Sequence, residues 1–310
     1  MIPIIGIVVV FGSIVAGYLM EHGKLGVLMQ PAELLIILGA AIGTLVVANP
    51  LPTLIRIGKG LTGVFTGGPY TKGLYLDNLK MLFELYNHAR KAGTAKIEEE
   101  VDAPEKSPVF SKYPNFLKSH HALAFLCDTL RMSCSGGVEP MDIDNMMEAD
   151  LEVHHRESEE PVSALTTMAD ALPGLGIVAA VLGVVITMGS LGGPKEEIGH
   201  KVASALVGTF LGILLCYGLF GPLAASMGKQ VAEEANYYAF LRIAALAFIK
   251  GMSPILAVEL ARRSIPSEVR PTFKEMETTC RNAGKAPAAK DAAPSKDAAS
   301  NKDAASGKAA

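Results

Sequence analysis

The sequence predicts an all-α membrane protein with four transmembrane helices and a large helical cytoplasmic domain. Half of the 310 residues are apolar, the chain contains no Trp, and its mean hydropathy is positive. The apolar residues gather in four stretches without charge, which run from Met1 to Met20, Leu34 to Ile55, Ala171 to Pro194 and Val202 to Gly228. Each stretch reaches the roughly 20 residues that an α-helix needs to cross a bilayer.

Trimmed to the hydrocarbon core, the predicted spans are about 2–20, 33–53, 171–191 and 202–225. The first could be taken for a signal peptide, but it has no basic segment before it and no clean cleavage site before Glu21. The last two could be core helices of a soluble protein, but their length and hydropathy favour membrane spans.

The distribution of positive charge predicts the orientation. The two short connections, 21–32 and 192–201, contain only Lys24, Lys195 and Lys201, and the other 25 of the 28 Lys and Arg residues lie in 54–170 or after 226. Because basic residues collect on the cytoplasmic side, both termini are expected in the cytoplasm of a bacterial inner-membrane protein.

The segment 54–170 is predicted to be a helical cytoplasmic loop. Apolar residues recur at helical spacing from Leu79 to Ala89, and Gly93 follows as a C-cap. Two further helices are expected, at about 114–133 and from Gly137 towards the third span.

Residues 226–281 are predicted to form a second cytoplasmic helical region, with a break at Gly251–Pro254. The remaining segment, 282–310, repeats the tetrapeptide Lys-Asp-Ala-Ala every six residues. Its few bulky apolar side chains cannot build a core, so we expect a disordered, low-complexity tail.

Small residues recur at helical spacing in the last two spans. Gly176 and Gly183 lie in the third, and Gly208 and Gly212 form a GxxxG pair in the fourth. Such faces let helices approach closely where lipid supplies no hydrophobic drive. We assign these glycines to helix packing, either between spans or beside a narrow hydrated path.

The four charge-free stretches contain no Asp, Glu, Lys, Arg or His, and the last of them holds the weakly acidic side chains of Cys216 and Tyr217. Intramembrane carboxylates usually mark ion relays. The sequence therefore predicts that a second subunit supplies any carboxylate that carries an ion. A self-contained transporter would need its own polar site near the midplane, which we do not expect here.

Enzyme and metal motifs are not found. Gly58-Lys59-Gly60 is not followed by the Ser or Thr of a phosphate-binding loop, and the four Cys residues are scattered without metal-ligand spacing. His154 and His155 are adjacent, so on a helix they point in different directions. We therefore expect no catalytic activity, no cofactor and no bound metal.

Several segments resemble a known family. The run from Met168 to Val185, the run from Val207 to Leu223, and the cytoplasmic stretches 89–98, 111–114 and 257–259 are similar to the signature segments of the MotA family of flagellar stator subunits. The resemblance covers about residues 1–280 and leaves the repetitive tail outside.

The resemblance implies a function. MotA-type subunits form a ring, thought to contain five copies, around the transmembrane helices of two MotB chains. An Asp of MotB carries the proton, and MotB is anchored to peptidoglycan. The ring pushes on charged residues of FliG in the rotor, so that ion flow becomes torque.

The resemblance also implies roles for two prolines. Pro173 and Pro222 match family prolines at the cytoplasmic ends of the last two spans, where they couple ion passage to conformational change. Pro173 could instead be a first-turn proline of a helix capped by Asp170. Pro222 is expected to remove a backbone hydrogen bond and kink its helix.

Four cytoplasmic charges are candidates for rotor contact. Arg90 and Glu98 match the family's rotor-facing charges, and Asp150 and Glu148 are lesser candidates. Alternatively, these residues have no role in rotor contact: Arg90 is then a cation at the end of a helix, and the acidic residues are carboxylates exposed to solvent. Exposed charge pairs are individually weak, which suits a contact that forms and releases repeatedly.

The resemblance also bears on the ion. Sodium-type relatives place a hydroxyl residue at the position of Ala180, whose methyl group cannot coordinate a cation. Thr209 occurs in both types, and Tyr217 is assigned with these residues to the ion path. We expect protons, with a sodium-driven stator as the alternative. Relatives of the ExbB or TolQ type are a further alternative, but they have three spans and an outside N-terminus.

Overall fold

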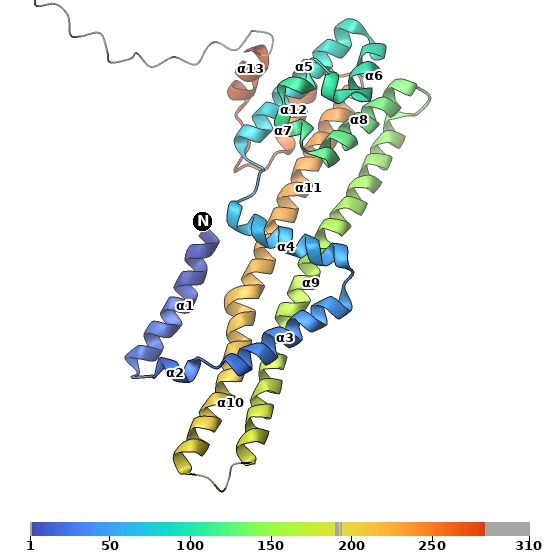
Figure 1. Ribbon diagram of the computed structural model, residues 1–310. Coiled ribbons are helices and arrows are strands. Elements are labelled where there is room, and N and C mark those ends of the chain that lie inside the picture. The colour runs from blue at the N-terminus through green and yellow to red at the C-terminus, as the bar shows by residue number, and fades with distance from the viewer. Residues whose placement is uncertain (1, 190–191, 193, 283–310) are drawn as a thin grey trace, which may run out of the picture.

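Two long helical rods form the axis of the molecule and connect its membrane half to its cytoplasmic domain (Figure 1). The computed structural model describes residues 2–189, 192 and 194–282. One rod is α9 (Pro140–Met188), and the other joins α10 (Lys195–Leu215), the π-helical turn η3 (Cys216–Phe220) and α11 (Gly221–Ile249). The predicted tail lies almost wholly outside the described residues.

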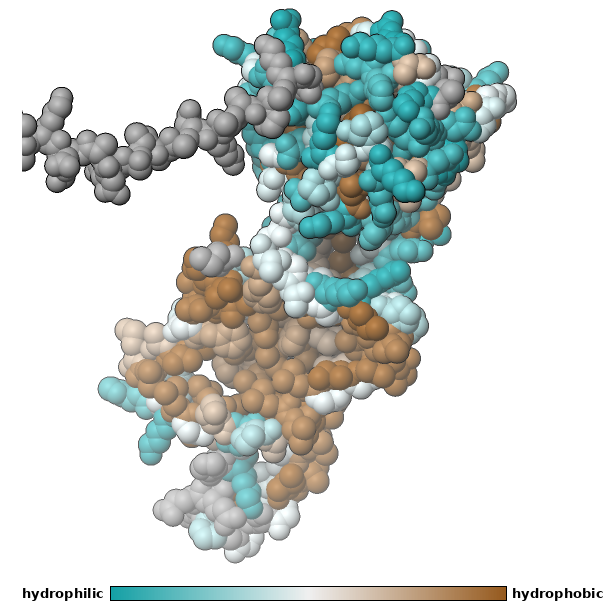
Figure 2. Space-filling view, turned by 45° about the horizontal axis from the view of Figure 1, so that its top comes forward, coloured by the Kyte–Doolittle hydropathy of each residue, from teal (hydrophilic) through white to brown (hydrophobic). Residues whose placement is uncertain are grey.

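Four helices among the described residues are long and apolar enough to cross a membrane. They are α1 (Ile2–Met20), the pair α2 (Leu25–Leu28) and α3 (Pro31–Ala48), the later part of α9, and the rod that contains α10. Figure 2 shows apolar side chains over this half of the molecule and polar ones over the opposite end. The predicted fold class, an all-α membrane protein with four spans, is confirmed.

The second span ends earlier than the predicted residue 53. Helix α3 stops at Ala48, Asn49 and Pro50 are extended, and a separate helix, α4 (Leu51–Thr66), begins. Pro50 disfavours a helical conformation of the preceding residue, so the chain turns there. Helix α4 crosses the two rods at the border between the two halves (Figure 1) and buries Ile57 and Val64.

The cytoplasmic domain consists of short helices around α11 and the start of α9. These are α5 (Lys72–Ala92), α6 (Thr94–Asp102), the 3-10 turns η1 (Pro104–Lys106) and η2 (Phe110–Lys112), α7 (Pro114–Leu117), α8 (His120–Ser135), α12 (Pro254–Ser264) and α13 (Phe273–Arg281). The expected helix boundaries at Gly93 and Gly251 are found, and both glycines have a positive φ, which suits a residue without Cβ.

Aromatic side chains fill the core of this domain. Tyr86 of α5 stacks on Phe248 of α11 with ring centroids 4.2 Å apart, and Phe240 meets Tyr75 edge to face at 5.4 Å. Tyr75, Tyr86 and Phe240 are almost completely buried. Helix α13 begins with a capping box between Thr272 and Glu275, and an ion pair from Glu275 to Lys72 joins it to α5.

Helix α9 runs without interruption from the cytoplasmic domain through the third span, with Pro161 and Pro173 inside it. The expected alternative for Pro173, a first-turn proline capped by Asp170, is therefore wrong. Pro173 lacks an N–H, so it removes a hydrogen bond from the interior of a continuous helix. The cytoplasmic helix and the span are one element because the residues before Pro173 pack well enough to keep the helix intact, with Leu165 and Leu172 buried.

Candidate ion path and cytoplasmic contact surface

The third and fourth spans touch through their backbones at the predicted glycines. A Cβ added to Gly176 would lie 2.8 Å from the carbonyl oxygen of Gly208, and one added to Gly212 would lie 2.5 Å from that of Leu172. A Cβ at Gly183 would lie 2.8 Å from the Cβ of Ala205. We call this line of contact the glycine seam: Gly176, Gly183, Gly208 and Gly212. Larger side chains cannot fit there without moving the backbone.

Two of the predicted ion-path residues lie on the seam. The backbone N of Ala180 would be 3.3 Å from a Cβ at Gly208, and the Cα of Thr209 would be 3.3 Å from a Cβ at Gly176. Both side chains are half-buried. The structure therefore places these two residues, which are 29 positions apart in the sequence, along the same line of contact, each beside a glycine of the other span.

Pro222 follows the π-helical turn η3, and this turn accommodates the backbone hydrogen bond that Pro222 was expected to remove. The N–H of Gly221 donates to the carbonyl of Cys216, five residues back, in place of the usual four. A π-helical turn lets the helix continue beside a residue that cannot donate a hydrogen bond. Tyr217 lies in the same turn with an exposed side chain, and Pro222 is exposed.

A carboxylate missed in the sequence lies against the seam. Glu33 belongs to the first turn of α3 and is only 6% exposed. A Cβ at Gly208 would lie 2.7 Å from its Oε2 atom, and one at Gly183 would lie 3.5 Å from its Oε1 atom. The expectation that this chain has no carboxylate within its spans is therefore wrong. Glu33 is the first residue of the predicted span 33–53, but it lies just before the charge-free stretch that begins at Leu34, and a search for uncharged runs therefore did not count it.

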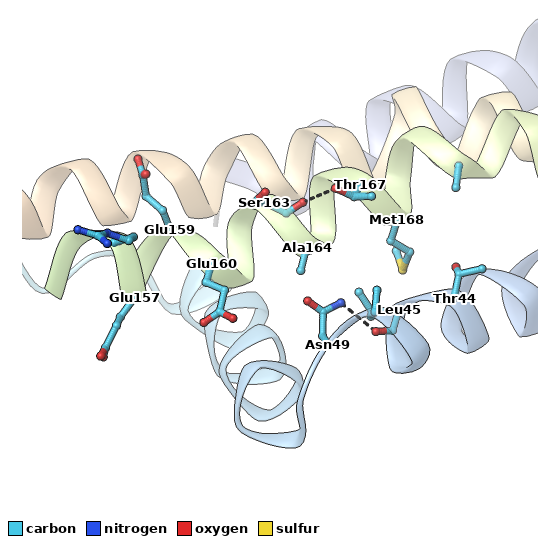
Figure 3. A pocket seen from close by; sticks show the side chains of 13 residues that line it. Thr44, Leu45, Asn49, Glu157, Glu159, Glu160, Ser163, Ala164, Thr167 and Met168 are labelled. Carbon is cyan, nitrogen blue, oxygen red and sulfur yellow. Dashed lines mark hydrogen bonds between the residues drawn. The ribbon is translucent and has the colours of Figure 1, made fainter. Parts of the chain in front are cut away.

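A pocket of about 700 Å³ opens between the end of α3 and the α9 segment that enters the membrane. Figure 3 shows Glu160 and Asn49 facing each other across it, with Ser163 and Thr167 along α9. The Asn49 amide donates to the carbonyl of Leu45 at 2.9 Å. Glu157, Glu159 and Glu160 line the pocket together with Arg156, and Glu157 is paired with Arg56 at 3.5 Å.

The predicted rotor-facing residues lie at the surface of the cytoplasmic domain. Arg90 is exposed at the end of α5, Glu98 is exposed on α6, and Asp150 is exposed on α9. Among the described residues, none of the three makes a hydrogen bond or ion pair. Glu148, the lesser candidate, accepts from Arg242 at 3.2 Å.

A buried contact fixes α6 beside α5. Glu100 is 2% exposed, contacts the Nδ1 atom of His88 and accepts a hydrogen bond from Ser107 at 2.7 Å. Buried polar groups of this kind specify one arrangement of the elements that they join. This contact therefore sets the positions of Arg90 and Glu98 relative to each other, which spacing along the sequence alone does not do.

The fold and the seam define a class of protein: a helical membrane protein of four spans, in which two spans pack through glycines and continue as rods into a cytoplasmic domain. Comparisons with known proteins agree. Residues 4–93 match the model of the motility protein A N-terminal region, and residues 118–239 match that of the MotA/TolQ/ExbB proton channel family.

Curated relatives match along almost the whole chain. Motility protein A of Escherichia coli K12 is 39% identical over 281 residues, which are 91% of this chain and 95% of that protein. The chemotaxis protein LafT of Vibrio parahaemolyticus is 34% identical over 273 residues, 88% of this chain and 96% of that protein. The chain therefore belongs to the motility protein A family, and the resemblance seen in the sequence is confirmed.

Solved structures share the fold. The structure of C. jejuni MotAB matches with a TM-score of 0.69 at 19% identity, covering 86% of this chain and 95% of that one. The flagellar MotAB stator complex from Bacillus subtilis matches with a TM-score of 0.68 at 22% identity, covering 86% and 96%.

Proposed function

We propose that this chain is a stator subunit of the bacterial flagellar motor, a multi-pass inner-membrane protein that turns ion flow into torque. The observation that carries the proposal is the match to motility protein A over 91% of the chain, including every helix that forms the glycine seam. Its family is one of proton channels rather than a class of enzymes. Both termini lie in the cytoplasm in this proposal, because the basic residues gather on the side of the α5–α8 domain.

The proposed complex contains a MotB partner and several copies of this chain. Helix α1 has no buried residue, and Val181, Val185 and Ile186 on α9 are exposed. Some of this surface faces lipid, but the two matched solved structures are complexes of MotA with MotB. We propose that MotB and neighbouring copies, five in the ring, cover part of it, and that MotB supplies a carboxylate and the peptidoglycan anchor.

The transported ion in this proposal is the proton. Sodium needs several oxygen ligands, and the Ala180 methyl group offers none beside Thr209 on the seam. A proton can instead pass through water between carboxyl groups. Movement at the seam would reach the cytoplasmic domain directly, because both rods cross from one half to the other without a break other than the π-helical turn. Pro173 and Pro222 give these rods local freedom to bend.

The test is rotation in a strain that lacks its own stator genes. This chain should restore swimming when it is produced together with its MotB partner and should fail without that partner. Swimming should continue when sodium is replaced by potassium and should stop when the proton gradient is dissipated. Failure of the pair to restore rotation, although both proteins reach the membrane, contradicts the proposed function. Arrest on sodium removal alone favours the sodium-driven alternative.

The proposed contact with FliG is electrostatic. Arg90 and Glu98 are exposed and free to meet charges on the rotor. The variant Arg90→Glu should lower torque strongly, and a charge reversal on FliG should restore part of it. The matched control is Lys91→Glu, which reverses an exposed charge one position along the same helix end. Equal, small effects of the two reversals would contradict the assignment of Arg90.

A further inference from the structure

The carboxyl group of Glu33 occupies a slot that two glycines create. Glu33 projects from the first turn of α3 between the third and fourth spans, and its Oε2 atom is buried without a hydrogen-bond partner. Any side chain at Gly208 would meet Oε2 at 2.7 Å, a distance that forces a shift. Among the described residues, no hydrogen bond and no ion pair reaches either oxygen of this group.

An ionised carboxylate in such a slot is costly. Removing an unpaired charge from water into an apolar interior is so unfavourable that the group binds a proton or pairs with a cation instead. The neighbours of the slot are Gly183, Ala205 and Gly208. The hydroxyl of Thr187 is engaged elsewhere, donating to the carbonyl of Gly183 at 2.7 Å. A sodium ion would need several more oxygen ligands, whereas a proton needs only the carboxylate.

The slot lies inside the membrane, towards the short loops. Gly183 precedes the end of α9 at Met188 by five residues, which corresponds to about 7 Å along the helix. Gly208 follows Lys201, the last charge before the fourth span, by seven residues, about 10 Å. Glu33 is thus in the outer third of a hydrocarbon core roughly 30 Å thick. Further inward along the same seam lie Ala180 and Thr209.

We propose that Glu33 is a proton-binding site of this chain, which takes up the conducted proton on the outer side of the seam and passes it inward. The inference rests on the proposed function. In the uptake step, hydronium in the outer entrance protonates the carboxylate, which leaves the neutral acid and one water molecule. In the release step, the acid returns its O–H proton to a water molecule on the inner side, from which the proton reaches the carboxylate of MotB.

The complete stator complex, with MotB, provides the test in a strain without its own stator genes. The variant Glu33→Gln keeps the size and a hydrogen-bonding amide but cannot exchange a proton. Its rotation rate per stator at low load should fall severalfold at mildly alkaline external pH, where protons are scarce, and much less at mildly acidic pH. The matched control is Glu21→Gln, an exposed glutamate in the connection after α1, which should behave as wild type at both pH values.

A second variant separates proton binding from packing. Glu33→Asp keeps the carboxyl group and should retain most of the rotation rate at alkaline pH, although it shortens the side chain. Equal rates for Glu33→Gln and Glu21→Gln at both pH values would overturn the proposal. So would a loss of both Glu33 variants from the motor, scored by counting fluorescent stators, with an unchanged rate per remaining stator. Failure of the wild-type pair to rotate would instead contradict the proposed function.

Discussion

The membrane half of this chain and its cytoplasmic domain bury their surfaces by different means. In the cytoplasmic domain, large side chains such as Tyr75, Tyr86 and Phe240 are almost completely buried in a core contributed by α5, α8, α11 and α12. In the membrane half, the tightest contacts are backbone against glycine, and most large apolar side chains of α1 and α9 point outward. In lipid, apolar side chains that face outward carry no free-energy cost, so burying them does not hold the helices together. Close approach of the backbones has to supply the packing instead.

This difference indicates that the cytoplasmic domain packs its core with residues of this chain alone, whereas the membrane half does not. The cytoplasmic domain has its own capped helices and ion pairs, such as those of Glu275. The membrane half has a seam of two spans, a carboxyl group without a hydrogen-bond partner among the described residues, and an α1 in which no residue is fully buried. The domain can therefore fold against the adjoining parts of the rods, whereas the spans leave apolar surface that lipid and, in the proposed complex, MotB and neighbouring copies would cover.

The largest effect is expected from the seam. In Gly212→Ala, the new methyl group would lie 2.5 Å from the carbonyl oxygen of Leu172, a backbone atom that cannot move aside without displacing the helix. We expect loss of swimming, while the cytoplasmic domain stays resistant to protease. The control is Gly43→Ala, where no atom lies within 4 Å of the new methyl group. Normal swimming of Gly212→Ala would contradict the view that the membrane half depends on close backbone packing at the seam.

A smaller effect is expected from an ion-pair cluster in the cytoplasmic domain. Glu259 on α12 accepts from Arg262 at 2.7 and 2.8 Å and from Arg263 at 2.9 Å. Hydrogen bonds from Arg262, followed by those from Arg263, hold the pKa of the Glu259 carboxyl below its usual range, against the opposite effect of burial. The variant Glu259→Gln should lower the stability of the domain by about 1–2 kcal/mol at neutral pH.

The pH dependence of this effect has a fixed sign. Because the pKa of Glu259 is lower in the folded state, the cluster stabilises the fold above the ordinary glutamate pKa of about 4.3. That contribution is lost as the pH falls through the lowered folded-state pKa. Thermal unfolding of wild type and Glu259→Gln in detergent should therefore differ at pH 7 and converge under strongly acidic conditions. A difference that persists in acid would show that the role of Glu259 is packing.

The smallest effect concerns a hydroxyl group in the aromatic core. Among the described residues, nothing forms a hydrogen bond with the buried Tyr86 hydroxyl, whereas the Tyr237 hydroxyl accepts a hydrogen bond from Asn78 at 2.9 Å. Removing an unsatisfied buried polar group favours the folded state, and removing a paired one does not. Tyr86→Phe should be neutral or stabilising by up to about 1 kcal/mol, and Tyr237→Phe should destabilise by about 1 kcal/mol. Thermal unfolding of both variants decides this; destabilisation by Tyr86→Phe would contradict it.

The sequence by itself determined the four spans, the helix ends at Gly93 and Gly251 and the small-residue faces, because each depends on the composition or spacing of one segment. Hydropathy locates a span, and Gly93 and Gly251 end helices through their own backbone freedom. The positions of Arg90 and Glu98 were available from resemblance, and their exposure agrees with a surface role.

Only the tertiary structure decided which residues of other helices each segment contacts. The unbroken course of α9 through Pro173 depends on packing between elements, because Leu165 and Leu172 before it are buried. Glu33 is the clearest case. Counted along the chain, it is a charge at the edge of an apolar stretch. In the fold, it is a buried carboxyl group against Gly183 and Gly208, because the missing side chains of two other helices make its slot.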